Sequence, residues 1–157
     1  MHKPTQILLV AATAALVAAS AGAQQAPPKP EQLIKWRQSA FQVLAWNSAR
    51  IKAVIDGNGD KLQAAKAAAA IAALANEGLL TLFPAGTETG KGWHDTSVKP
   101  ELFKDTAKVA ALNADFTKQA NDLSRVAATG DEAGLKDEFA KLGKTCKSCH
   151  DEFRITN

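Results

Sequence analysis

The segment spanning residues 135–153 constrains the fold most, because its apolar residues recur at alternating spacings of four and three. The positions are Leu135, Phe139, Leu142, Cys146, Cys149 and Phe153. A period close to 3.6 residues places all of them on one face of a helix. Similar spacings recur along the chain, whereas the alternation typical of strands is weak. The sequence therefore predicts an all-α protein whose last helix turns both of its cysteines inward.

Three further helices are expected from the same periodicity and from end signals. The predicted helices cover about residues 30–56, 60–82, 100–130 and 131–153. Pro30 suits the first position of a helix, and Asp60 with Gln63 three residues on resembles a capping box. Gly130 is expected to end the third helix, and Asp131 to cap the fourth. Four such helices with short links predict an antiparallel four-helix bundle.

One connection is longer than the others. Residues 84–99 contain several glycines and no apolar periodicity. A loop of this length in a compact domain is usually either functional or disordered. Because it carries Trp93 and His94 and follows Phe83, we expect an ordered loop near a functional site.

The first 23 residues have the pattern of an export signal. A short basic start precedes an apolar stretch and small residues that end in Ala21-Gly22-Ala23. A membrane anchor is the alternative, but the apolar stretch is shorter than the roughly 20 residues that span a bilayer. We therefore expect a signal peptide at residues 1–23, a single domain at residues 24–157 and a periplasmic protein. The formal net charge of +3 is spread along the chain, which does not indicate nucleic-acid binding.

The two cysteines belong to the sequence Cys146-Lys147-Ser148-Cys149-His150. This is the C-x-x-C-H signature of c-type haem attachment. Thiols three residues apart on a helix share a face, so both can reach the two vinyl groups at one porphyrin edge, while the adjacent His binds iron. The motif predicts one covalent haem c with Cys146 and Cys149 as thioethers and His150 as the metal ligand.

Two alternatives compete with haem attachment. A structural zinc site needs about four ligands, and the chain after the signal offers two cysteines and two histidines, with His94 in the distant loop. A redox pair of thioredoxin type belongs to a βαβ setting that the helical pattern does not predict. Both therefore explain the motif less well than haem does.

The sequence offers no methionine as a ligand for the iron's second axial position. The only Met of the chain is Met1, which leaves with the signal peptide. The position is therefore expected to hold His94, a Lys, water or nothing. An open face would make the iron high-spin and able to bind small gases.

Arg37 interrupts an otherwise apolar stripe of the first helix. The stripe contains Ile34, Arg37, Phe41, Leu44, Ser48, Ile51 and Ile55. One interpretation is that the Arg37 stem packs inward while its guanidinium reaches solvent. The other is that the guanidinium pairs with a haem propionate. The pattern alone leaves both open.

These features together resemble cytochrome c′, the class II c-type cytochromes. The haem motif lies near the C-terminus of a four-helix chain, and family-like stretches occur at residues 35–39, 83–88, 99–103 and 146–154. The resemblance implies that Arg37 and Gln38 lie beside the haem and its propionates, and that Thr87 and Glu88 border it. It also places Phe41 over the distal face of the iron, where many members have Leu or Met.

The family's properties imply a function. The resemblance suggests a non-enzymatic haem protein with a five-coordinate iron that binds NO or CO, and it is compatible with electron transfer by the same haem. It also suggests a homodimer formed through the first two helices. The alternative is a low-spin class II electron carrier whose sixth ligand is not methionine. The redox partner is not indicated by the sequence.

Overall fold

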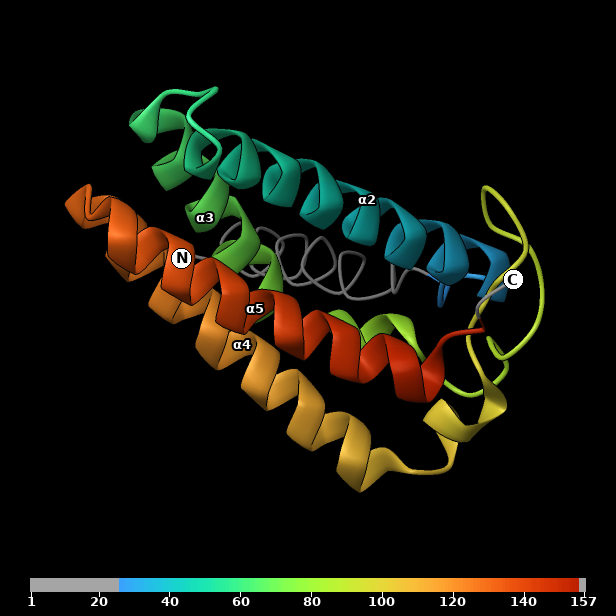
Figure 1. Cartoon of the computed structure of the whole chain (residues 1–157). Helices are drawn as coiled ribbons and strands as arrows, with labels where there is room; N and C mark the ends of the chain where they lie inside the picture. Colours follow the sequence, from blue (N-terminus) through green and yellow to red (C-terminus); the bar gives the residue numbers. More distant parts are fainter. Residues whose placement is uncertain (1–25, 156–157) are drawn as a thin grey trace, which may run out of the picture.

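The computed structural model describes residues 26–155 and forms a four-helix bundle (Figure 1). Its helices are α2 (Pro30–Ile55), α3 (Lys61–Asn76), α4 (Thr106–Thr129) and α5 (Glu132–Phe153). Two short 3₁₀ turns, η2 (Leu79–Leu82) and η3 (Pro100–Phe103), flank the long loop. Helix α2 packs on α3, α3 on α4, and α4 on α5. The predicted all-α bundle is confirmed.

Side-chain caps begin three of the helices where the sequence supplies an aspartate. The carboxylates of Asp60, Asp105 and Asp131 accept hydrogen bonds from backbone N–H groups in the first turns of α3, α4 and α5. Each bond satisfies a donor that the helix itself leaves unpaired. Of the predicted capping box at α3, only the Asp60 side forms, with the Leu62 N–H as donor, and the Gln63 side-chain oxygen instead accepts a hydrogen bond from Arg50 of α2.

Two predicted helix boundaries were wrong. Helix α3 ends at Asn76, and Gly78 adopts a left-handed backbone with φ of 74°, so the chain reaches Leu82 through a 3₁₀ turn. Helix α4 begins at Thr106 after its cap Asp105, because the segment from Pro100 forms a separate 3₁₀ turn. In both places apolar periodicity continues through a break in the backbone, which is why the pattern alone misplaced the ends.

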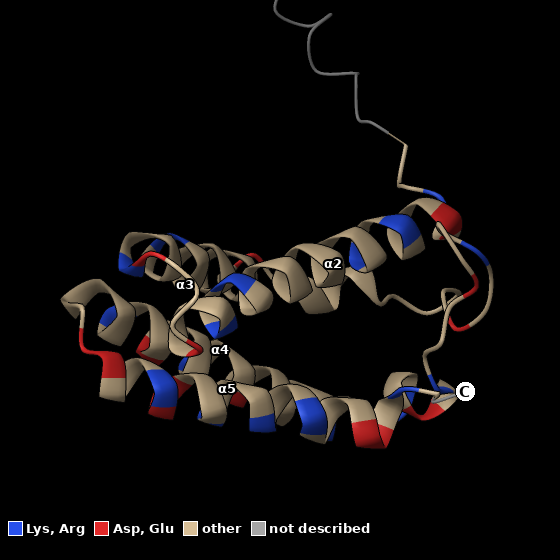
Figure 2. Cartoon of the chain, turned by 45° about the horizontal axis from the view of Figure 1, so that its top comes forward, with Lys and Arg blue, Asp and Glu red and all other residues tan. Residues whose placement is uncertain are grey.

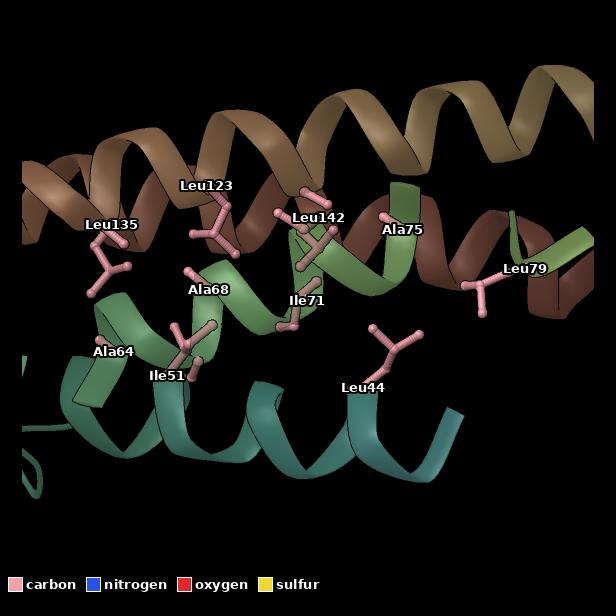
Figure 3. Packing of buried hydrophobic residues seen from close by; sticks show 14 residues of the cluster. Leu44, Ile51, Ala64, Ala68, Ile71, Ala75, Leu79, Leu123, Leu135 and Leu142 are labelled. Atoms are coloured by element: carbon pink, nitrogen blue, oxygen red, sulfur yellow. The ribbon is translucent and has the colours of Figure 1, made fainter. Parts of the chain in front are cut away.

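The main hydrophobic core lies between the helices of the bundle (Figure 3). Small residues of α3 allow close packing: Ala64, Ala67, Ala68 and Ala75 are almost fully buried. Against them and Ile71 of the same helix pack the aliphatic side chains of the neighbouring helices, namely Leu44, Ile51, Leu123, Leu135 and Leu142. Alanine on α3 lets its neighbours approach, so this half of the bundle closes tightly.

A second, smaller cluster lies toward the other end of the bundle. It is built on Leu102, Val109 and Phe153, with Phe83 and Cys149 among the partly buried side chains packed against it. At this end the ribbons of α2 and α5 diverge, and the two helices touch only sparsely (Figure 2). The long loop and the start of α2 lie at the same end as the C-terminus of α5 (Figure 1).

Charged residues of both signs are interspersed over the outer faces of the helices (Figure 2). Several form exposed ion pairs one turn apart, for example Lys147 with Asp151 on α5. Among residues 26–155, no helix is long and apolar enough to cross a membrane. The predicted signal peptide, residues 1–23, lies outside the described residues.

Candidate haem site

Helix α5 presents its two cysteines to the interior at the junction of the two hydrophobic clusters. Cys146 packs against the main core, and Cys149 packs against the cluster around Phe153. Both cysteines are partly buried, and no disulfide joins them. The inward stripe predicted for this helix is confirmed, with Leu135, Leu142 and Phe153 buried along it.

Burial sets the charge state of this motif. It raises the pKa of the Cys146 thiol and of the Cys149 thiol, so both are neutral near pH 7. The His150 residue is exposed as a whole, but part of its ring is buried. This burial, and next the positive charge of Arg154, lower the pKa of the imidazole, while the negative charge of Asp151 opposes the shift. A neutral imidazole is the form that binds a metal.

Arg37 is buried and points into the long loop. Only 2% of the residue is exposed, so its guanidinium does not extend to solvent, and that interpretation was wrong. Its two terminal nitrogens donate to the Thr87 hydroxyl (2.9 Å), the Thr87 carbonyl (2.8 Å) and the Thr96 hydroxyl (2.6 Å). A longer bond of 3.4 Å reaches the carbonyl of Leu82. The guanidinium therefore fastens α2 to the loop.

The charge of Arg37 is compensated only in part. Burial lowers the pKa of Arg37, and the negative charge of Glu88 opposes this shift. Hydrogen bonds from the backbone N–H groups of Glu88 itself and of Gly86 hold the pKa of the Glu88 carboxyl below its usual value, and Arg37 adds to the effect. The pair places an ionised carboxylate and a buried guanidinium at the same wall of the site.

Thr87 is the buried centre of the loop's first turn. It is 1% exposed, and its hydroxyl donates to the Pro84 carbonyl at 2.8 Å while accepting from Arg37. The segment between Pro84 and Glu88 is thus held by hydrogen bonds instead of by a helix or a strand. The loop predicted to be ordered is indeed built in this way.

Gln38 and His94 meet at the far part of the loop. The Gln38 amide nitrogen donates to the His94 carbonyl at 2.9 Å, and the amide oxygen accepts from the Trp93 backbone N–H at 2.7 Å. The His94 ring nitrogen Nδ1 lies 2.8 Å from the Asp95 carbonyl and 3.3 Å from the Gln38 amide nitrogen. His94 therefore takes part in the internal structure of the loop.

Phe41 lies one turn after Arg37 on α2 and is 41% exposed, although it belongs to the predicted inward stripe. Its ring meets Phe83 edge to face, with centroids 6.2 Å apart. The Arg37 guanidinium lies over the same Phe83 ring, 4.8 Å from its centroid. Phe41 and Arg37 of α2 and Phe83, which directly precedes the long loop, thus form one wall of the site.

Several residues that shape this wall were not singled out from the sequence. Thr96 accepts from Arg37, and Gly92 lies so close to α2 that an added Cβ would come within 2.8 Å of the Lys35 backbone nitrogen. These contacts join positions more than fifty residues apart, so local sequence patterns do not reveal them. The only sequence signal for the close approach of the loop backbone to α2 is the glycine content of the loop.

The residues present fit a covalent haem. Two neutral thiols one turn apart face an apolar interior, a metal-binding imidazole follows them, and an aromatic side chain stands partly exposed on the neighbouring helix. Among residues 26–155, no group of three or more His, Cys, Asp or Glu gathers as a metal site, so the zinc alternative finds no support. A helical bundle with this motif on its last helix defines a c-type cytochrome.

Comparisons with known proteins agree. The family model of cytochrome c′ matches residues 32–154. Cytochrome c′ of Rhodocyclus tenuis is 59% identical over 129 residues, which are 82% of this chain and 97% of that protein. The chain belongs to the cytochrome c′ family. It therefore carries one haem c, covalently attached through Cys146 and Cys149.

Solved structures show the same fold. A cytochrome c′ described as having an unusual ligand-controlled dimer dissociation is 38% identical, with a TM-score of 0.80 over 83% of this chain and 100% of that one. A nitric oxide complex of a cytochrome c′ variant from Alcaligenes xylosoxidans is 29% identical, with a TM-score of 0.74 over 84% of this chain and 100% of that one. A carbon monoxide complex of another variant from that organism has 30% identity and a TM-score of 0.72, covering 82% and 98%.

Proposed function

We propose that this protein binds NO or CO at a five-coordinate haem iron whose only protein ligand is His150. The observation that carries the proposal is the side chain on α2 one turn beyond Arg37, which is the aromatic Phe41 and not a methionine. A phenyl ring shields a face but cannot bind iron. Bound haem supplies an iron with one open axial position for a diatomic gas.

The protein's own residues have distinct parts in this proposal. The neutral imidazole of His150 binds iron, and the Cys146 and Cys149 sulfurs fix the haem edge against the interior of the bundle. Phe41 restricts approach from the α2 side. Arg37, Gln38, Thr87 and Glu88 remain predicted neighbours of the haem. The hydrogen bonds of Arg37 to Thr87 and of Gln38 to His94 also hold the loop that walls the site. The relatives that bind NO and CO support the same ligands here.

The proposal is tested by the rate at which the reduced protein binds CO in stopped-flow measurements. Phe41→Ala removes the shielding ring, so we expect faster association than in the wild type. Phe41→Leu, which keeps an apolar side chain of intermediate size, should fall between the two. An unchanged rate in Phe41→Ala would show that this ring is not the gate. A six-coordinate, low-spin electron paramagnetic resonance spectrum of the wild type would refute the open face and favour the low-spin electron carrier.

We also infer that the protein is exported to the periplasm and acts by binding without catalytic turnover. The export signal at residues 1–23 supports the location, and haem attachment at Cys146 and Cys149 is consistent with it. The absence of an acid–base or nucleophilic pattern in the sequence supports binding as the activity. Electron transfer through the same haem remains compatible with this proposal.

A homodimer through α2 and α3 is the proposed assembly. The outer face of α2 exposes Trp36, Val43 and Trp46, and α3 adds Leu62, which is 58% exposed. Large apolar side chains gathered on one face are typical of an interface, and a two-fold axis pairs such a face with itself. The relative described by its ligand-controlled dimer dissociation supports this assembly.

A further inference from the structure

Residues 90–96 of the long loop form a tight hairpin, referred to below as the 90–96 hairpin. Lys91 and Asp95 form an antiparallel bridge, the Thr96 backbone N–H donates to the Gly90 carbonyl at 3.0 Å, and the Gly92 N–H donates to the His94 carbonyl at 3.0 Å. These hydrogen bonds within the segment give it a defined conformation, although it contains no helix or extended strand.

One side of the 90–96 hairpin rests on α2. The Gln38 amide bonds to the backbone of Trp93 and His94, and the Trp93 indole N–H donates to the Ser39 hydroxyl at 2.9 Å. An added Cβ on Gly92 would lie 2.8 Å from the Lys35 nitrogen and 3.0 Å from a backbone carbon of the preceding residue. The Gln38 amide oxygen would lie closer still, so both the backbone and a side chain of α2 exclude a Cβ here, and only glycine permits the contact.

The residues that follow the hairpin are joined to the end of α5. The Ile155 N–H donates to the Ser97 carbonyl at 2.7 Å, and the Lys99 N–H donates to the Phe153 carbonyl at 2.8 Å. Val98 and Arg154 form an antiparallel bridge between these bonds. This join begins three residues after His150, the proposed iron ligand.

We propose that the 90–96 hairpin is a strut that fixes the separation of α2 and α5 at the haem end and thereby limits gas access. The two helices touch only sparsely themselves, so the chain path from Gln38 through the hairpin to Ile155 ties them there, together with the Arg37 hydrogen bond to Thr96 at the end of the hairpin. Phe41 lies three residues beyond Gln38, and Phe153 three beyond His150. Gly92 and Trp93 are therefore positioning residues that act through the two helices. This inference rests on the proposed function.

Gly92→Ala in the haem-loaded protein tests the strut without substituting any proposed haem neighbour, but the added methyl group also displaces the Gln38 amide oxygen. The new methyl group cannot fit against the α2 backbone, so the hairpin must move outward. Hydrogen exchange should then accelerate at two amides: that of Trp93, which bonds to Gln38 of α2, and that of Ile155, which bonds to Ser97 directly after the hairpin. We expect CO association to become about fivefold faster, which corresponds to about 1 kcal/mol in the barrier.

Two other variants complete the experiment. Gly143→Ala makes the same chemical change on α5 where an added Cβ meets nothing within 4 Å, so its exchange pattern and CO rate should match the wild type. Trp93→Leu removes the indole bond to Ser39 from a side chain that is 67% exposed, so the bundle should stay folded. We expect it to move both readouts in the same direction as Gly92→Ala, by a smaller amount.

Each outcome decides for or against the strut. Unchanged protection of the Trp93 and Ile155 amides in Gly92→Ala would show that close approach at Gly92 does not hold the helices together. Lost protection with an unchanged CO rate would show that the strut does not limit access. If the wild type binds no CO, the proposed function fails, whereas coupled loss of protection at both amides would still establish the tie between α2 and α5.

Discussion

Replacing Thr87 by Val isolates one buried hydroxyl without changing the shape of the side chain. Thr87 is 1% exposed, and its hydroxyl accepts from the Arg37 guanidinium at 2.9 Å while donating to the Pro84 carbonyl at 2.8 Å. A valine methyl fills the same space but can neither donate nor accept. The guanidinium then loses a partner in a place that water does not reach.

The magnitude follows from the two bonds. A hydrogen bond to a charged group contributes about 1.5–3 kcal/mol, and one between neutral groups about 0.5–1.5 kcal/mol. The Pro84 carbonyl keeps a second, longer hydrogen bond of 3.3 Å from the Thr87 backbone N–H. Losing the bond from the Thr87 hydroxyl to this carbonyl therefore contributes the smaller share of the destabilisation. We expect Thr87→Val to lower the free energy of unfolding by about 2–4 kcal/mol.

Urea unfolding of the haem-loaded protein, followed by far-ultraviolet circular dichroism, measures this change. Thr81→Val is a matched control, because its exposed hydroxyl likewise donates to a carbonyl three residues earlier, at 2.8 Å, but has no buried guanidinium beside it. We expect that control to change stability by less than about 0.5 kcal/mol. Equal effects of the two substitutions would refute the argument that burial and the Arg37 charge set the size of the effect.

Three other predictions concern acid stability, haem attachment and assembly. Hydrogen bonds from Lys118 and then Arg125 lower the pKa of the Asp122 carboxyl in the folded state, so its stabilisation is present above the unfolded pKa and is lost as the pH falls through the folded one. Asp122→Asn should therefore narrow the difference in urea midpoint between about pH 7 and about pH 3, and an unchanged difference would contradict this prediction. Replacing both haem-attaching cysteines by Ser should let acidified organic solvent extract the haem, which stays with the wild-type chain; haem that remains bound in the variant would contradict the thioether assignment. Trp46→Lys places a charge at a side chain that is 61% exposed on α2, and we expect sedimentation velocity to show dimer converted to monomer, while an unchanged dimer would move the interface elsewhere.

The motif and the bundle could be predicted because both depend on short-range spacing. Cys146, Cys149 and His150 lie within five residues, and the inward stripe of α5 follows from the helical repeat alone. Helix ends were less predictable. The periodicity of α3 runs past Asn76 into a 3₁₀ turn, and only the left-handed backbone at Gly78 shows where the helix stops.

The partners of Arg37 could not be predicted from the sequence. Its position on an apolar stripe identified it as unusual, but two interpretations fitted the pattern equally well. The folded chain brings Thr87 and Thr96 to its guanidinium from fifty and fifty-nine residues away. The role of Arg37 toward a haem propionate stays a prediction, as do the haem contacts of Gln38, Thr87, Glu88 and Phe41.

The sequence by itself determined the chemistry of this protein and the local form of its helices. A thiol pair and an imidazole at fixed spacing specify the attached group, and the absence of any methionine after Met1 restricts what can bind the iron. The tertiary structure alone decided how the haem end is walled, because hydrogen bonds of α2 and α5 to residues 84–99 join distant segments. Local spacing carries no information about such contacts, since they form only after the helices have packed.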